Sequence, residues 1–173
     1  MKFQIEKAVE ILSQTPAVVK SLLGNLSADW VENAPRSENW SSFDIVGHLI
    51  HGEETDWITR AEAILGQGEN RIFEPFDRFA QFEKSKGKTL NELIETFAVL
   101  RAKNLVTLSE MSLTEENLKL KGIHPELGEV TLEQLLATWV VHDLNHIKQI
   151  VTVLASKYAE NVGVWRQYLS ILQ

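Results

Sequence analysis

The sequence predicts an all-α protein folded as a four-helix bundle. Its 173 residues include only 4 prolines and 9 glycines. Apolar residues recur at spacings of three and four rather than alternating, which is typical of amphipathic helices. Four long stretches of this kind, each long enough for several helical turns, predict a bundle. With 44% hydrophobic residues, the length is sufficient for one hydrophobic core, so we expect a single domain over residues 1–173 and no strand.

The first helix is predicted over residues 3–23, with a restart at Thr15 and Pro16. Threonine is a common N-cap, and proline is favoured at the first helical position because its missing N–H has no intrahelical partner there. Gly24 is a natural stop, and residues 25–39 are expected to connect to the second helix.

The second helix is predicted to begin at Ser41 and to run to about Leu65. Asp44 lies three residues after Ser41, which is the spacing of a capping box. The sequence Gly66-Gln67-Gly68 then breaks the helix. Residues 69–88 lack helical periodicity and are expected to form a long loop, a kind of segment that is often functional.

The third helix is predicted from a second capping box, Thr89 with Glu92, to about Met111. Its apolar side chains form one stripe: Leu90, Leu93, Ile94, Phe97, Leu100, Leu105 and Leu108. A turn of helix is expected at 114–117, and residues 122–128 are expected to form a structured turn.

The fourth helix is predicted from Thr131 to about Lys157. Gln134 completes its capping box, and apolar residues precede and follow a histidine pair in its middle. A short helix carrying Trp165 and Leu169 is expected to close the chain.

Charge and composition exclude several classes of function. Seventeen basic against twenty-four acidic residues give a net charge of -7, which argues against nonspecific binding to nucleic acid or anionic membranes. The absence of cysteine excludes disulfides, thiolate metal ligands and a cysteine nucleophile. The first residues lack the apolar run of a secretory signal, and no apolar stretch approaches the roughly 20 residues needed to span a bilayer. We therefore expect a cytoplasmic protein.

Three histidines are candidate metal ligands. His142 and His146 are four residues apart, so both lie on one face of the fourth helix. Two imidazoles rarely hold a metal ion alone, and His48 in the second helix, between Gly47 and Leu49, is the best third ligand. Imidazole nitrogen suits divalent zinc, nickel or iron. Gly47 and Gly52 would allow another helix to approach closely.

The alternative interpretation is that these histidines only pack at the boundary of the core. The strongly apolar flanks of the pair favour ligation, because unpaired imidazoles are costly to bury. A zincin is excluded, since Asp143 stands where its HExxH motif has glutamate and no downstream histidine follows. The sequence also disfavours a ferritin-like di-iron site, because only Asp143 and His146 have the carboxylate-x-x-His spacing.

Other residues near the predicted site have open roles. His51 is expected at the pocket rim or in solvent rather than as a fourth ligand, and His124 is expected to make structural hydrogen bonds. Asp143 could orient an imidazole, stabilise a helix contact or act as a general base. Trp57 and Trp139 occur at core spacing and are expected to pack.

Four short motifs together resemble the DinB-like family, more closely its branch of YfiT-type metal-dependent hydrolases and bacillithiol transferases. They are Trp40-Ser41, Val46-Gly47-His48-Leu49, Gly122-Ile123-His124-Pro125-Glu126-Leu127-Gly128 and Trp139-Val140-Val141-His142-Asp143-Leu144-Asn145-His146. The resemblance implies up-down-down-up topology, with a long connection between the second and third helices. It also implies a metal triad, which falls on His48, His142 and His146.

The expected function is that of a divalent-metal-binding protein, a metal-dependent thiol S-transferase or hydrolase acting on a small molecule. A low-molecular-weight thiol is one substrate that the resemblance implies. The alternatives are a non-catalytic, stress-associated metal-binding bundle and a structural bundle that binds no metal. A site that opens into a cleft lined by residues 69–88 would favour an enzyme. Family members often pair through helix faces, so a homodimer is expected.

Overall fold

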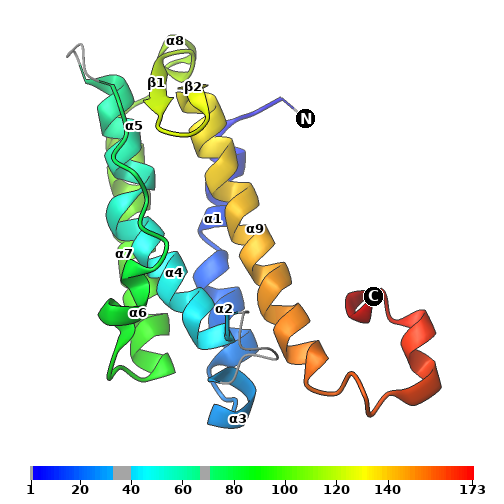
Figure 1. Cartoon of the computed structure of the whole chain (residues 1–173). Coiled ribbons are helices and arrows are strands. Elements are labelled where there is room, and N and C mark those ends of the chain that lie inside the picture. Colours follow the sequence, from blue (N-terminus) through cyan, green and yellow to red (C-terminus); the bar gives the residue numbers. More distant parts are fainter. Residues whose placement is uncertain (1, 33–39, 67–70) are drawn as a thin grey trace.

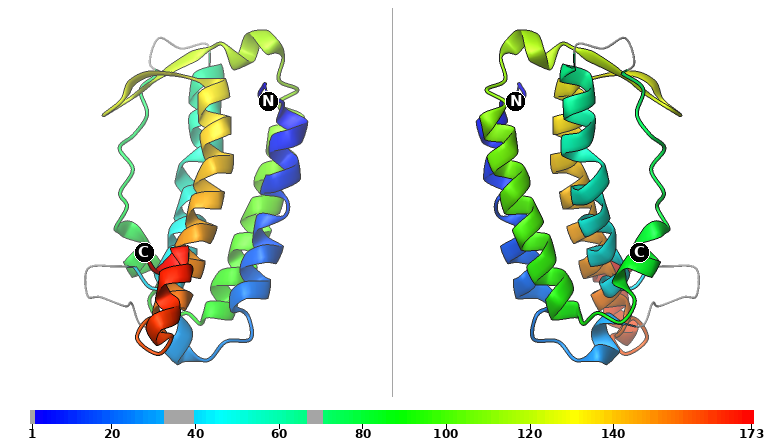
Figure 2. Two further views of the ribbon diagram at one scale, coloured as in Figure 1. Left: turned by 90° about the vertical axis from the view of Figure 1, so that its right-hand side faces the viewer. Right: turned by 90° about the vertical axis from the view of Figure 1, so that its left-hand side faces the viewer.

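The computed structural model describes residues 2–32, 40–66 and 71–173, and these form a bundle of four helical columns (Figure 1). The first column is α1 (Ile5–Leu12) with α2 (Thr15–Leu23), and the second is α4 (Ser42–Thr55) with α5 (Trp57–Leu65). The third and fourth columns are α7 (Leu90–Glu110) and α9 (Leu132–Ser156). Figures 1 and 2 show that the second and third columns run parallel to each other and opposite to the first and fourth. The predicted bundle and its up-down-down-up order are confirmed.

Shorter elements connect the columns. They are α3 (Ala28–Val31), α6 (Ala80–Ser85), α8 (Glu115–Leu118), strands β1 (Lys121–His124) and β2 (Gly128–Thr131), and the 3-10 helices η1 (Gly163–Tyr168) and η2 (Ser170–Leu172). The predicted connector at 25–39 therefore contains a short helix. Its last part, residues 33–39, lies outside the described residues, as do residues 67–70 of the predicted loop.

The three predicted capping boxes start α4, α7 and α9. Thr89 illustrates the pattern: its hydroxyl accepts from the Glu92 N–H at 3.3 Å, and the Glu92 carboxylate accepts from the Thr89 N–H at 2.7 Å. Both partners therefore satisfy N–H groups that the first helical turn would leave unpaired. Ser41 and Thr131 head equivalent boxes with Asp44 and Gln134.

Two helix breaks differ from the prediction. The restart in the first column occurs at Thr15, but Gln14 is the N-cap and Thr15 is already helical, its hydroxyl donating to the Ile11 carbonyl at 3.3 Å. The predicted second helix divides at Asp56, where φ of -112° and ψ of -76° interrupt the regular backbone. The interruption separates α4 from α5 and places Asp56 at their junction.

The segment after α5 is not a loop throughout. Residues 71–77 form an extended segment (Figure 2), and a turn at residues 78–79 leads into α6, which packs on α4. Gly47 permits this contact, because a Cβ there would lie 2.6 Å from the Ser85 hydroxyl oxygen. The predicted close approach at Gly47 thus occurs, against α6.

A β-hairpin replaces the structured turn predicted at 122–128, so the expectation of no strand was wrong. Strands β1 and β2 pair antiparallel from Lys121 with Thr131 to His124 with Gly128, and Gly128 turns the chain at φ +74°. Four residues a side are too few for alternation to be recognised against the surrounding helical pattern. Ile72 forms a parallel bridge with Ile123, which ties the extended segment to the hairpin.

The core consists of two apolar clusters separated by a polar layer. One cluster contains Ile45, Leu49, Ile94, Phe97 and Ile150, among others, and the second contains Trp57, Ile64, Leu108, Leu132 and Trp139, among others. Along α4–α5, α7 and α9, buried polar residues stand between the two clusters. This layer contains the candidate site. Among the helices of the described ranges, none has the length and apolar composition that a transmembrane span requires.

Candidate metal centre

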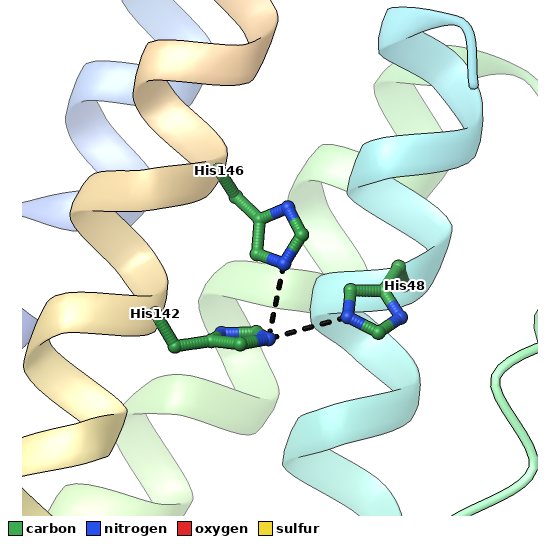
Figure 3. Close-up of side chains that lie close together, drawn as sticks. All are labelled: His48, His142 and His146. Atoms are coloured by element: carbon green, nitrogen blue, oxygen red, sulfur yellow. Dashed lines mark hydrogen bonds between the residues drawn. The ribbon is translucent and has the colours of Figure 1, made fainter. Parts of the chain in front are cut away.

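The three predicted ligands meet in the polar layer. Figure 3 shows His48 of α4 facing His142 and His146 of α9. His142 Nε2 lies 3.2 Å from His48 Nε2 and 3.0 Å from His146 Nε2. One nitrogen from each residue falls within 4.8 Å of the other two, the only such group of three possible ligands in the described ranges. The helical spacing of His142 and His146 and the packing of α4 on α9 produce this arrangement.

Burial keeps the three imidazoles neutral. Loss of hydration and, next in size, the neighbouring His146 lower the pKa of His48 from 6.5 to about 3. The pKa of His142 is lowered to about 2, again mainly by burial and next by His146. Burial also lowers the pKa of His146. At neutral pH each ring therefore has a nitrogen lone pair available.

The arrangement fits a divalent metal ion. His146 Nδ1 lies 2.8 Å from the Gln149 Oε1, an oxygen that only accepts, so Nδ1 carries the proton and Nε2 its lone pair. Bonds of about 2.0–2.1 Å at tetrahedral or octahedral angles would place neighbouring ligand nitrogens about 2.8–3.4 Å apart. The separations of His142 Nε2 from the Nε2 atoms of His48 and His146, 3.2 and 3.0 Å, fall in that range. His48 Nδ1 and His142 Nδ1 are buried without a hydrogen-bond partner among the described residues, so no such bond constrains either ring.

The metal-free protein is expected to lose stability as pH falls below 6.5. An unfolded histidine binds a proton at about pH 6.5, whereas folded His48 binds one only near pH 3, so the unfolded state holds more protons between these values. Stability then decreases with decreasing pH, by about 2 kcal/mol from His48 alone at about pH 5. Urea unfolding at about pH 7 and pH 5 measures the loss. His48→Gln should reduce it, and an unchanged difference in that variant would contradict the assignment.

His51 lies outside the histidine cluster. Its side chain is buried rather than in solvent, with Nδ1 3.3 Å from Lys84 Nζ and its ring 4.8 Å from that of Phe76. The expectation that it points to solvent was wrong, because α6 packs on α4 and the Phe76 ring lies against His51. His51 is consequently a matched control for substitutions at His48, His142 and His146.

The predicted structural role of His124 is confirmed. Its Nδ1 accepts from the backbone N–H groups of Glu126 at 3.1 Å and Leu127 at 3.2 Å, which holds the hairpin turn. An Nδ1 that accepts has no proton, so Nε2 is the N–H donor of this ring.

A buried ionic network supports the histidines, and the sequence analysis missed it. Arg101 of α7 forms a bidentate pair with Asp143 of α9 at 2.6 and 3.0 Å, and contacts Glu53 of α4 at 2.8 and 3.1 Å. Trp139 Nε1 and Asn104 Nδ2 also donate to the Glu53 carboxylate, at 3.1 and 3.0 Å. Of the roles considered for Asp143, the structure shows the helix contact.

This network connects the two helices that carry the histidines. The side chains of Arg101, Glu53 and Asp143 are at most 2% exposed, and one guanidinium balances only one of the two carboxylates. Arg101 and Asn104 continue the stripe of Phe97 and Leu108, so polar residues at core positions were the signal that could have revealed the network.

A cavity of about 340 Å³ adjoins the cluster, with His48 and His142 in its wall. Its other lining residues are Gly52, Asp56, Trp57, Arg60, Phe73, Phe76, His124, Leu127, Val130, Gln134, Leu135 and Thr138. We call this space the aromatic cavity. Trp57 lies edge-on to His142 with 5.0 Å between ring centroids and stacks on Trp139 at 5.7 Å, so it lines the cavity as well as packing in the core. Trp139 packs in the core as predicted.

Comparison with known proteins identifies the class. The sequence model of the DinB superfamily matches residues 11–150. A Bacillus subtilis protein named "Putative metal-dependent hydrolase YfiT" is 25% identical over 150 residues, covering 86% of this chain and 83% of that protein. A Bacillus licheniformis protein with the same description is 28% identical over 150 residues, covering 85% and 83%.

The chain belongs to the DinB superfamily. Its fold matches that of the solved YfiT structure from Bacillus subtilis with a TM-score of 0.77 and 22% identity, over 91% of this chain and 89% of that one. That protein is described as having an unusual four-helix bundle topology. Together with the histidine cluster, these relatives support a metal-binding protein of the YfiT type.

Proposed function

We propose that this protein is a metal-dependent enzyme that acts on a small molecule, either as a hydrolase or as a thiol S-transferase. His48, His142 and His146 would hold one divalent ion, with zinc, nickel or iron as the candidates. One observation carries the proposal: the histidine cluster opens into the aromatic cavity instead of being sealed in the core. The names of the relatives, which describe metal-dependent hydrolases, support the same reaction class.

The donor set determines the chemistry. Three neutral imidazoles leave coordination positions for water or substrate, unlike the closed four-ligand set of a structural zinc site. An ion held there supplies Lewis acidity, which lowers the pKa of a water or thiol that it binds. Because the chain contains no cysteine, a transferred thiol would come from a second small molecule.

The cavity residues position a substrate beside the histidines. Phe73 and Phe76 come from the extended segment within the region predicted as a functional loop, and they form apolar walls together with Trp57. Such walls exclude water and bind an apolar group, whereas a non-catalytic metal-binding bundle has no need of a cavity there.

An activity screen of the metal-loaded protein tests this proposal. Protein loaded with zinc, nickel or iron is assayed against esters and amides, and against an aryl halide with a panel of low-molecular-weight thiols. We expect turnover in one class that is lost in His142→Ala. Thr138→Trp, which changes no ligand but narrows the cavity, should keep the metal and lose turnover. Full activity of Thr138→Trp, or no turnover in either class, would contradict the proposal and favour a non-catalytic metal-binding protein.

A further inference from the structure

The aromatic cavity is lined by two regular rows of side chains. His48, Gly52, Asp56 and Arg60 follow one another every fourth residue along α4 and α5. Gln134, Thr138 and His142 do the same along the neighbouring α9. Twelve residues, or about three helical turns, separate His48 from Arg60, and the break at Asp56 lies between them. The histidine cluster and Arg60 therefore mark opposite ends of an elongated cavity.

Arg60 has unused hydrogen-bond donors at its end of the cavity. Its side chain is 11% exposed, and its Nε pairs with the Asp56 carboxylate. The guanidinium also lies over the Phe73 ring, 5.1 Å from the centroid. In the described part of the chain, neither Nη atom makes a hydrogen bond, so four N–H groups of a rigid planar fork remain. Neither Nη atom is fully enclosed by protein, so a ligand in the cavity can reach these donors.

His124 adds a second donor to the cavity wall. Since its Nδ1 accepts two backbone N–H groups, its Nε2 carries the proton. Its ring lies edge-on to Phe73 with 6.3 Å between centroids. Arg60 and His124 thus both border Phe73, and both offer N–H groups.

The remaining walls fit an apolar body. Trp57, Phe73, Phe76, Val130 and Leu135 line the space between the two ends. The volume of about 340 Å³ is at the small end of ligand pockets, which limits the ligand to about one ring with a short chain. A single guanidinium whose charge is already offset by Asp56 suits one negative charge rather than the two of a phosphate monoester.

We propose that the aromatic cavity binds a small monocarboxylic acid with an apolar, preferably aromatic, body, whose carboxylate bonds to Arg60. The inference rests on the proposed function, since it assigns the substrate class of the same site. The planar fork of arginine matches a carboxylate bidentately, and His124 Nε2–H is a further donor for its oxygens. The far end of the molecule then lies toward His48 and His142.

Calorimetric binding of 3-phenylpropionate and its uncharged amide to the zinc-loaded protein tests the proposal. We expect the wild type to prefer the acid by about ten- to hundredfold, the range for hydrogen bonds to a charged group. Arg60→Gln should abolish the preference, whereas the control Arg71→Gln, which removes the same charge outside the cavity lining, should retain it. Asp56→Asn releases Arg60 from its partner and should strengthen acid binding severalfold. If Arg60→Gln does not fold, the effect of Asp56→Asn on acid binding is the test.

The outcomes separate this inference from the proposed function. An acid preference that survives Arg60→Gln but disappears in His142→Ala would place the carboxylate on the metal ion and overturn the inference alone. A preference that depends on Arg60 in a protein that binds no zinc would support the inference and contradict the proposed function. Equal binding of acid and amide by both the wild type and Asp56→Asn would overturn the inference.

Discussion

Arg101→Met is expected to destabilise the protein by about 3–5 kcal/mol, the usual cost of removing one partner from a buried ion pair. The substitution leaves Glu53 and Asp143 buried with two negative charges and no cation between them. For a chain of this length, the melting temperature should fall by about 6–20 °C. Thermal unfolding followed by circular dichroism measures the change.

Two further variants test whether charge is the cause. Lys103→Met removes a positive charge from an exposed position two residues along α7, and should change stability by no more than about 0.5 kcal/mol. Adding Glu53→Gln and Asp143→Asn to Arg101→Met removes the unpaired carboxylates and should recover part of the loss. A melting temperature of Arg101→Met equal to that of the wild type would show that the network does not stabilise the bundle.

His142→Ala and His146→Ala are each expected to eliminate stoichiometric metal binding while the helices remain. Two imidazoles rarely hold a divalent ion. Metal affinity should therefore fall by more than the 10- to 100-fold that is typical when a residue hydrogen-bonded to a metal ligand is substituted. The helices should persist because two apolar clusters hold them on either side of the polar layer. Elemental mass spectrometry after zinc loading and desalting, together with far-ultraviolet circular dichroism, measures both effects.

His51→Ala is the matched control for this experiment. It removes an imidazole from α4 that is buried close to the cluster but not part of it, so one ion per chain should remain. Loss of metal in His51→Ala, retention of metal in His146→Ala, or collapse of the helical signal when the metal is chelated would contradict the assignment.

The sequence predicted the long helices because their signals are local. Ser41, Thr89 and Thr131 satisfy their own first turns through residues three positions away, and a pattern confined to one turn can be read without tertiary information. His142 and His146 were recognisable as a pair for the same reason. Their meeting with His48, 94 residues away from His142, was predicted from the apolar surroundings of each helix and from the family resemblance, and the structure brings the three together.

Most of the features missed depend on contacts between distant segments. The division at Asp56 is an exception, because its ion pair with Arg60 joins residues four positions apart at the edge of the cavity, where burial raises the pKa of the Asp56 carboxyl group to about 6. The partners of Arg101, Glu53 and Asp143, are on other helices. From the local sequence alone Arg101 therefore resembles an ordinary surface charge, and only its position in the apolar stripe of α7 indicates burial. The strands of the hairpin are stabilised by pairing with each other and with Ile72. Neither contact is visible within the four residues of one strand, so the local sequence does not reveal the strands.

We infer that His48, His142 and His146 hold one divalent ion beside the aromatic cavity. A crystal structure of the zinc-loaded protein, with data collected on both sides of the zinc absorption edge, would locate the ion. We expect one anomalous peak per chain, about 2.0–2.1 Å from the Nε2 atom of each of the three histidines. A loaded protein with no peak between these nitrogens, or with a peak bound by His51, His124 or Asp56 instead, would contradict it.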